Sequence, residues 1–221
     1  MKQNNLEQVY KRLFEAFGAQ NWWPGETQLE VIVGAVLTQN TAWQNVKRAI
    51  VNLKGAGVLS LNGLIDVGSD GLAELIRPSG YFNVKAKRLK AVVNFLSGSG
   101  GIKGLETAPT VELRRMLLDV NGVGEETADS ILLYAFNRPV FVVDAYTKRI
   151  FSRLGLLDSG AGYAVVQEFF ENSLPSDVNL YNEYHALIVR LGKDFCKKTR
   201  PQCLNCPLND LCEFQNTPEA K

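Results

Sequence analysis

Residues 113–137 read LRRMLLDVNGVGEETADSILLYAFN, and this stretch decides the fold. Apolar residues at helical spacing run through Leu113–Leu118 and resume through Glu125–Asn137. Between them lies Val120-Asn121-Gly122-Val123-Gly124, in which an apolar residue separates two glycines. Because glycine adopts the left-handed conformations that tight turns require, the stretch predicts two helices joined by a short hairpin.

The hairpin has the properties of a phosphate-binding turn. Gly122 and Gly124 let the backbone come close to a ligand, and amides at the start of the second helix point outward at an anion. Gly122, Val123 and Gly124 are therefore predicted to hold the DNA backbone, which positions a duplex without reading its sequence. An ordinary turn between two helices is the alternative interpretation.

The rest of the chain is predicted to be helical, and only Pro139–Val143 looks extended. Thr27 and Glu30 have the spacing of a capping box and place a helix start just after Pro24-Gly25. With 221 residues, of which 46% are apolar, the chain can bury one large core or two modest ones. The fold class is all-α. The other predicted helices carry apolar stripes at 6–17, 29–37, 43–53, 86–96, 145–154 and 180–191.

All four cysteines lie near the C-terminus, at Cys196, Cys203, Cys206 and Cys212, in the pattern C-x6-C-x2-C-x5-C. Clustered thiols with no cysteine elsewhere indicate one metal centre, and four thiolates can hold a [4Fe-4S] cluster. A zinc site built from four cysteines usually has two short paired spacings, whereas only one C-x2-C pair is present. Zinc and disulfides remain alternatives.

The N-terminal segment 1–5 has no apolar core of a signal peptide, and the sequence has no apolar run of about 18 residues that could span a bilayer. These features predict a cytoplasmic protein, in which thiols stay reduced. The net charge of +1 does not identify a partner. Basic residues gather at 85–90 and 197–200, and such runs usually form solvated helix faces.

Asp144 ends the extended segment and precedes the helical stretch 145–154. This position predicts an N-cap. It would also keep the carboxylate ionised beside the helix dipole. An ionised carboxylate there could stabilise an oxocarbenium-like sugar or orient a water molecule against its C1′ atom.

Four motifs, Leu37-Thr38-Gln39, Gly122-Val123-Gly124, Asp144 and the cysteine tail, resemble the endonuclease III superfamily of base-excision DNA glycosylases in this order. The resemblance covers almost the whole chain. It implies a two-domain fold with a groove into which the target nucleotide is flipped. The implied domains are 1–20 with 139–221, which carries the cluster loop 196–212, and a six-helix barrel, 21–138, which ends in the hairpin element 113–137.

The resemblance also assigns roles to single residues. Asp144 falls on the catalytic aspartate, and Gln39, with Asn40 beside it, falls on the side chain that fills the gap left by the flipped base. The implied cofactors are the [4Fe-4S] cluster and a monovalent cation at the hairpin. The implied partner is double-stranded DNA with a damaged base, bound by a monomer in the cytoplasm at the nucleoid.

One departure from the superfamily changes the expected chemistry. Bifunctional members carry a lysine two residues after the second hairpin glycine, and its amine attacks C1′ to form a Schiff base. This chain has Glu126 there, which is expected to be a carboxylate of the first helical turn. The sequence therefore predicts a monofunctional enzyme. The rivals are a lyase for oxidised pyrimidines that uses Lys148 or Lys193, and a catalytically silent DNA-binding module.

Trp22, Trp23 and Trp43 lie in one window around Gln39 and predict an aromatic base pocket, with core packing as the alternative. Indole faces would select a cationic alkylated purine such as 3-methyladenine by stacking and cation–π attraction. His185, the one histidine, is expected in the core or at an interface, without a catalytic role.

A closer resemblance, to the bacterial 3-methyladenine glycosylase branch, agrees with this pocket. In that branch the double tryptophan and an aromatic residue at the position of Trp43 line the base pocket, and a lysine near the position of Lys193 lies close to it. The cysteine tail departs from the best-known form of that branch, which lacks the cluster. The strings that carry the resemblance are Asn21-Trp22-Trp23-Pro24, Leu37-Thr38-Gln39-Asn40-Thr41, Arg77-Pro78-Ser79-Gly80-Tyr81 and Glu126-Thr127-Ala128-Asp129.

Overall fold

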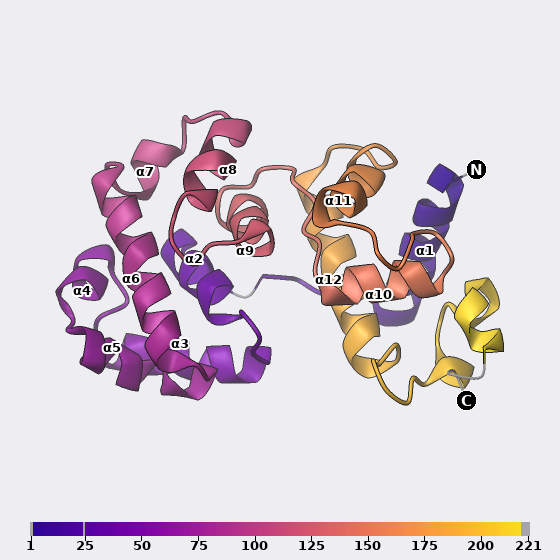
Figure 1. The fold of residues 1–221 in the computed structure, drawn as a ribbon, viewed down its shortest axis with the longest axis horizontal. Coiled ribbons are helices and arrows are strands. Elements are labelled where there is room, and N and C mark those ends of the chain that lie inside the picture. Colours follow the sequence, from indigo (N-terminus) through magenta and orange to yellow (C-terminus); the bar gives the residue numbers. More distant parts are fainter. Residues whose placement is uncertain (1, 24, 218–221) are drawn as a thin grey trace. The chain divides into compact units, whose positions relative to one another are not determined.

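The structure, a computed structural model, describes residues 2–23 and 25–217. Pro24, which belongs to the string Asn21-Trp22-Trp23-Pro24, lies outside the described residues. Helices and no strands form across the described ranges, which confirms the all-α class (Figure 1). No described helix combines the length and apolar character needed to cross a bilayer. The helices are α1 (Lys2–Phe17), α2 (Gln28–Leu37), α3 (Trp43–Gly55), α4 (Leu61–Asp66), α5 (Ser69–Leu75), α6 (Phe82–Gly98), α7 (Gly101–Leu105), α8 (Thr110–Leu118), α9 (Glu125–Ser130), α10 (Ala145–Arg153), α11 (Tyr163–Glu171) and α12 (Val178–Asp194), with the short segments η1 (Arg77–Ser79), η2 (Ile131–Ala135), η3 (Cys203–Asn205), η4 (Asn209–Leu211) and η5 (Glu213–Asn216).

The chain divides into two compact units. Unit 1 consists of Met1–Trp22 and Pro139–Lys221, and unit 2 consists of Trp23–Arg138. The boundary expected from the sequence was after residue 20 instead. Since the division falls between Trp22 and Trp23, the two adjacent tryptophans belong to different units.

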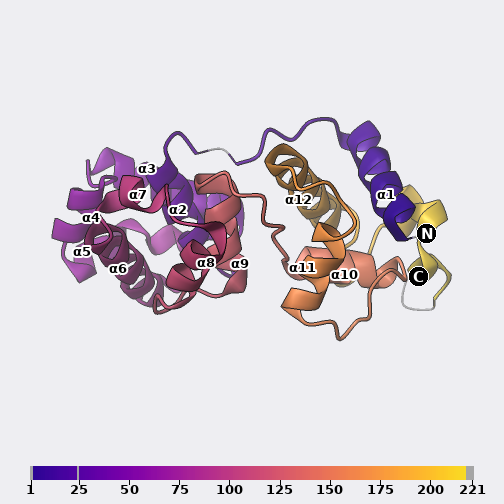
Figure 2. The same cartoon turned by 90° about the horizontal axis from the view of Figure 1, so that it is seen from above.

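Unit 2 is built around α2, which packs against α3, α6 and η2 (Figure 2). All of its residues from Glu30 to Leu37 are buried, so this helix is covered on every side. Its N-cap is Thr27, whose hydroxyl accepts a hydrogen bond from the Glu30 backbone amide at 3.1 Å. The helix ends at Leu37 and delivers Gln39 to the unit's surface.

Unit 1 joins both ends of the chain through an aromatic core. Helix α12 packs against α10 and α1 (Figure 1). The Tyr184 hydroxyl of α12 donates to the Leu6 carbonyl of α1 at 2.8 Å. Phe141 and Phe170 stack with ring centroids 4.0 Å apart. This packing fixes α10, whose N-terminus carries Asp144.

The predicted single helix 125–137 is wrong in its second half. The α-helical part, α9, ends at Ser130, and Ile131–Ala135 form the π-helix η2. Its wider turn is closed by a hydrogen bond from the Phe136 amide to the Ile131 carbonyl at 3.2 Å. π-Helical turns are rare and concentrate at functional sites. The helices α4, α5, α7 and α11 lie in stretches that were predicted to be helical but were not delimited individually.

The basic run 85–90 is not a solvated face throughout. Lys85 is buried, and its ammonium donates to Leu37 O at 2.8 Å, Ser79 O at 2.7 Å and Thr41 Oγ1 at 2.6 Å. Burial lowers the pKa of Lys85 to about 8. Lys90 also turns inward and donates to Ile65 O at 2.7 Å. Both lysines satisfy carbonyl groups at loops and helix ends, which spacing along the sequence did not reveal.

Candidate active site

Asp144 is the N-cap of α10, as its position before the helix predicted. Its Oδ1 atom accepts two hydrogen bonds from Thr147, one from the backbone amide at 2.7 Å and one from the hydroxyl at 2.9 Å. The residue is 9% exposed. The helix N-terminus therefore fixes one of the two carboxylate oxygens of Asp144.

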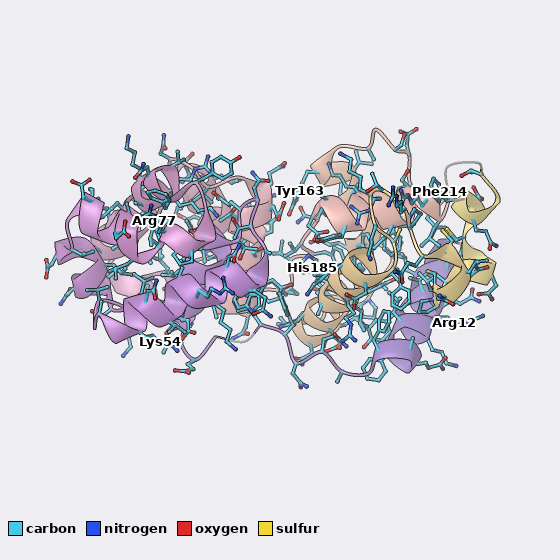
Figure 3. All side chains as sticks on the ribbon, turned by 90° about the horizontal axis from the view of Figure 1, so that it is seen from below. Arg12, Lys54, Arg77, Tyr163, His185 and Phe214 are labelled. Atoms are coloured by element: carbon cyan, nitrogen blue, oxygen red, sulfur yellow. The ribbon has the colours of Figure 1, made fainter. Side chains whose placement is uncertain are left out.

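The other oxygen, Oδ2, faces His185 of α12, which is labelled in Figure 3. The distance from Oδ2 to His185 Nε2 is 3.7 Å, which is too long for a hydrogen bond, and the two groups form an ion pair when the imidazole is protonated. His185 is 6% exposed, as expected for a core residue. Its link to Asp144 was not predicted, because the two residues are far apart in the chain and meet only when α10 packs on α12.

The pKa of Asp144 lies below its ordinary value. Burial alone would raise it, but the interactions with His185 and Thr147 together outweigh burial. The carboxylate is therefore ionised at neutral pH. Because the folded-state pKa is lowered, the stability gained from this group is present above its unfolded pKa and is lost as the pH falls through the folded-state pKa.

The extended segment 139–143 that leads to Asp144 is held by side chains of α11. In place of a neighbouring strand, these side chains satisfy backbone groups of the segment. Tyr163, at the start of α11, is labelled in Figure 3. The hydrogen bonds run from Phe141 N to Glu171 Oε1 at 2.8 Å, from Gln167 Nε2 to Phe141 O at 2.8 Å, and from Val143 N to Tyr163 Oη at 3.3 Å.

The hairpin between α8 and α9 requires its first glycine for two reasons. Gly122 has a φ of +87°, and a Cβ atom there would lie 2.3 Å from Arg88 Cγ. Gly124 caps α9, and an added Cβ would meet open space. The Val123 amide is used inside the turn, where it donates to Val120 O at 3.0 Å. An anion would therefore meet the amides at the start of α9.

Gln39 is docked on the hairpin, although the two are far apart in the sequence. Its Nε2 atom donates to Gly122 O at 3.0 Å and to Thr127 Oγ1 at 2.9 Å. Arg88 donates to the Oε1 atom of the same amide. Asn40, the next residue, is exposed and has a φ of +52°. The loop after α2 and the hairpin thus form one surface within unit 2.

Trp23 and Trp43 lie together in unit 2. Their rings meet edge to face with centroids 4.9 Å apart, and Tyr134 lies 5.0 Å from Trp23 on another side. Gly34 of α2 makes room for the Trp23 indole, since a Cβ there would lie 3.1 Å from it. Tyr134 was not predicted, because it comes from the π-helix.

The other two residues predicted for the base pocket belong to unit 1. Trp22 is half-buried at the end of that unit's first segment. Lys193 is exposed in the last turn of α12. The structure thus brings two of the three tryptophans together, and the places of Trp22 and Lys193 in a pocket stay predictions.

The four cysteines line one cavity in unit 1. Arg153, in the last turn of α10, donates to Cys196 Sγ at 3.2 Å, and Cys212 Sγ lies 3.4 Å from the Arg153 carbonyl. The guanidinium also lies 4.2 Å from the ring centre of Phe214, which is labelled in Figure 3. The remaining thiols in the cavity belong to Cys203 and Cys206.

The chemistry of the cavity fits a metal group with several ions. Burial raises the pKa of Cys206 to about 11, and the neighbouring thiols also raise it, so ionised thiolates need a cation among them. Over residues 2–23 and 25–217, no three His, Cys, Asp or Glu side chains form a site for a single metal ion. Four cysteine thiols that line one cavity are the donor set of a [4Fe-4S] cluster and also of a zinc site, which stays the alternative.

Comparison with known proteins agrees with this architecture. Residues 33–176 match the family described as HhH-GPD superfamily base excision DNA repair protein. A curated protein of Methanocaldococcus jannaschii, "Putative DNA repair glycosylase MJ1434", is 52% identical over 218 residues, which cover 96% of this chain and 99% of that protein.

Two solved structures extend the comparison. The 3-methyladenine DNA glycosylase MagIII of H. pylori, bound to 1,N6-ethenoadenine, is 31% identical with a TM-score of 0.73, over 87% of this chain and 97% of that chain. A non-covalent endonuclease III–DNA complex has a TM-score of 0.83 at 22% identity, over 97% and 96% of the two chains. At that identity the second likeness concerns the fold alone.

Proposed function

Because the chain belongs to the HhH-GPD superfamily of base excision DNA repair proteins, we propose that it is a monofunctional DNA glycosylase that removes an alkylated purine. The observation that carries the proposal is Asp144, a buried carboxylate that stays ionised at the N-terminus of α10. A fixed negative charge of this kind stabilises the cationic sugar that develops as a glycosidic bond breaks.

The proposed reaction is a single hydrolysis. The bond between C1′ and the base nitrogen breaks, and its electron pair leaves with the base. Asp144 stabilises the positive charge that develops on the sugar, and a water molecule adds its oxygen to C1′ and loses one proton to the carboxylate. A cationic 3-methylated purine leaves as a neutral base, so it needs little acid catalysis. The product is an abasic site.

The partner is double-stranded DNA with one damaged base, bound by a monomer. In this proposal the amides at the start of α9 hold a backbone phosphate, together with the predicted monovalent cation at the hairpin. Gln39, which is hydrogen-bonded to Gly122 and Thr127 beside the hairpin, would enter the duplex where the target nucleotide leaves, with Asn40 beside it. A screen of duplexes carrying alkylated, oxidised, deaminated or mismatched bases tests the substrate class.

The aromatic side chains in unit 2 support an alkylated purine as substrate. Trp23, Trp43 and Tyr134 offer π faces and edges, and a cationic base gains cation–π attraction in addition to stacking. The similar H. pylori enzyme is a 3-methyladenine DNA glycosylase.

Trp43→Ala should lower the turnover of methylated duplex DNA by roughly one to two orders of magnitude, because each tenfold loss corresponds to about 1.36 kcal/mol of transition-state binding. Trp43→Phe should retain much of the activity. Val51→Ala, at an exposed position of the same helix, is the control and should leave turnover unchanged. Single-turnover release of 3-methyladenine measures the effect. Faster release of thymine glycol or uracil than of 3-methyladenine from otherwise identical duplexes would contradict the cation-selective pocket.

The protein should excise the base without cutting the strand. Glu126 is exposed in the first turn of α9, and a carboxylate cannot form the imine that lyase chemistry requires. The abasic product should become a strand break only after hot alkali. Glu126→Lys would place an amine there and should restore part of the imine chemistry. Borohydride trapping of the unaltered protein on abasic DNA would instead favour a lyase that uses Lys148 or Lys193, and Lys→Ala variants of each would identify the amine.

We further propose that Cys196, Cys203, Cys206 and Cys212 hold a [4Fe-4S] cluster. The cavity that the four cysteines share and the partly buried Cys206 thiol support this assignment. When bound, the cluster supplies the positive iron charge that keeps four neighbouring thiolates ionised. Arg153 reinforces it with a hydrogen bond to a ligand sulfur.

A further inference from the structure

The two oxygens of the Asp144 carboxylate have different environments. Oδ1 accepts both hydrogen bonds from Thr147 and belongs to the helix cap. Oδ2 is outside the cap and faces the imidazole of His185 at 3.7 Å. Any chemistry of this carboxylate that leaves the cap intact therefore uses Oδ2, and the side chain beside Oδ2 influences it most directly.

We infer that His185 is a positioning residue for the reaction: its imidazole keeps the Oδ2 side of Asp144 ionised and correctly oriented inside a buried site. The inference rests on the proposed function, in which Asp144 is the catalytic carboxylate. His185 acts through that carboxylate, and it has no assigned contact with the substrate. The helix cap also favours the ionised form through Thr147, but it holds only Oδ1, and burial opposes ionisation, so the imidazole beside Oδ2 adds a separate contribution.

The other titratable groups around this pair have different partners. On α12, the Tyr184 hydroxyl donates to Leu6 O and the ring of Tyr10 from α1 packs against it at 5.2 Å. On α11, the Tyr163 hydroxyl accepts a hydrogen bond from the Val143 amide. On α10, the backbone amide of Lys148 donates to Asp144 O, and its side chain has no part in the pKa shift of Asp144. Among the described residues, His185 is therefore the side chain outside the helix cap to which the lowered pKa of Asp144 is attributed.

A purely structural histidine and a positioning histidine predict different pH profiles. If His185 only fills space, its replacement lowers the rate by the same factor at every pH. If it holds Asp144 ionised, its replacement lets burial dominate, so the Asp144 pKa rises and activity is lost as the pH falls. Wild-type protein should keep a nearly constant rate over the same range, because its carboxylate is ionised throughout.

The experiment measures single-turnover release of 3-methyladenine from dimethyl sulfate-treated duplex DNA between pH 5.5 and 8.5, with Asp144→Asn as the background. In His185→Phe the rate should fall by more than about threefold from pH 7.5 to 5.5, because loss of the imidazole raises the pKa of Asp144 toward this range. The wild-type rate should change by less than about threefold. His185→Gln, which keeps a neutral donor near Oδ2, should lie between them.

Tyr184→Phe is the matched control, because it removes a buried hydrogen bond from the adjacent position of α12 without touching Asp144. It should lower the melting temperature and leave the pH profile unchanged. A second measurement does not depend on activity, so it also applies to an inactive variant. The carboxyl ¹³C signal of Asp144, identified by its absence in Asp144→Asn, should titrate at higher pH in His185→Phe than in wild type.

Two failures can be told apart. If base release does not depend on Asp144 at any pH, the proposed function is wrong, and the ¹³C titration still tests the interaction between His185 and Asp144. If release depends on Asp144 but His185→Phe and His185→Gln have the wild-type profile and the wild-type Asp144 titration, the role inferred for His185 is overturned.

Discussion

Asp144→Asn should lower the rate of base release by about 10²–10³-fold while leaving duplex affinity within a few-fold of the parent. Asparagine is as good an N-cap as aspartate, so α10 should keep its start and its bond to the Thr147 amide. The substitution removes the negative charge that the cationic transition state needs. Rates under single turnover and affinity for a duplex with an uncleavable target separate the two effects.

Thr147→Val is the control for this prediction. It removes the hydroxyl bond to Oδ1 but keeps the backbone amide bond and the charge, so its effect on the rate should be much smaller. Thermal melting of both variants shows whether the cap survives. An equal loss of binding and turnover in Asp144→Asn would mean that the residue mainly holds the fold of unit 1.

The protein isolated without oxygen should be brown and contain about four irons and no zinc per chain. Cys206→Ser should remove the iron and unfold the C-terminal segment, because the thiols are the group around which this segment is arranged. Duplex affinity should fall as well. Metal analysis, the visible absorption band and proteolysis of the C-terminal segment are the measurements.

Leu204→Ala is a matched control, since Leu204 lies between two of the cysteines and is 94% exposed. Its iron content should equal that of the parent. Stoichiometric zinc in protein prepared anaerobically would refute the cluster and show that the four cysteines form a zinc site. Retention of iron in Cys206→Ser would show that this thiol is not a ligand.

Features with a local cause could be predicted from the sequence. The hairpin follows from glycine conformation, and the Asp144 cap follows from a polar residue between an extended segment and a helical stripe. The all-α class follows from apolar spacing over most of the chain. Each of these depends on a few consecutive residues, so the later packing did not change them.

Features that depend on packing could not be predicted in this way. His185 and Asp144 meet only because α12 lies on α10, and Gln39 reaches Gly122 only because α2 is buried in unit 2. Lys85 looked like part of a solvated run, yet it satisfies carbonyl groups inside unit 2. A single sequence carries no periodic signal for such contacts.

The position of Tyr134 beside Trp23 depends on the number of residues in the π-helix η2, and not only on which residue types are present. A π turn holds one residue more than an α turn over the same rise. Deleting one of Ile131, Leu132 or Leu133 would let the segment relax to an α-helix and would change the direction in which Tyr134 points from it. Tyr134 would then leave Trp23 although every aromatic residue was still encoded. Relatives of this protein should therefore be sorted by the number of residues in this segment before their aromatic residues are compared.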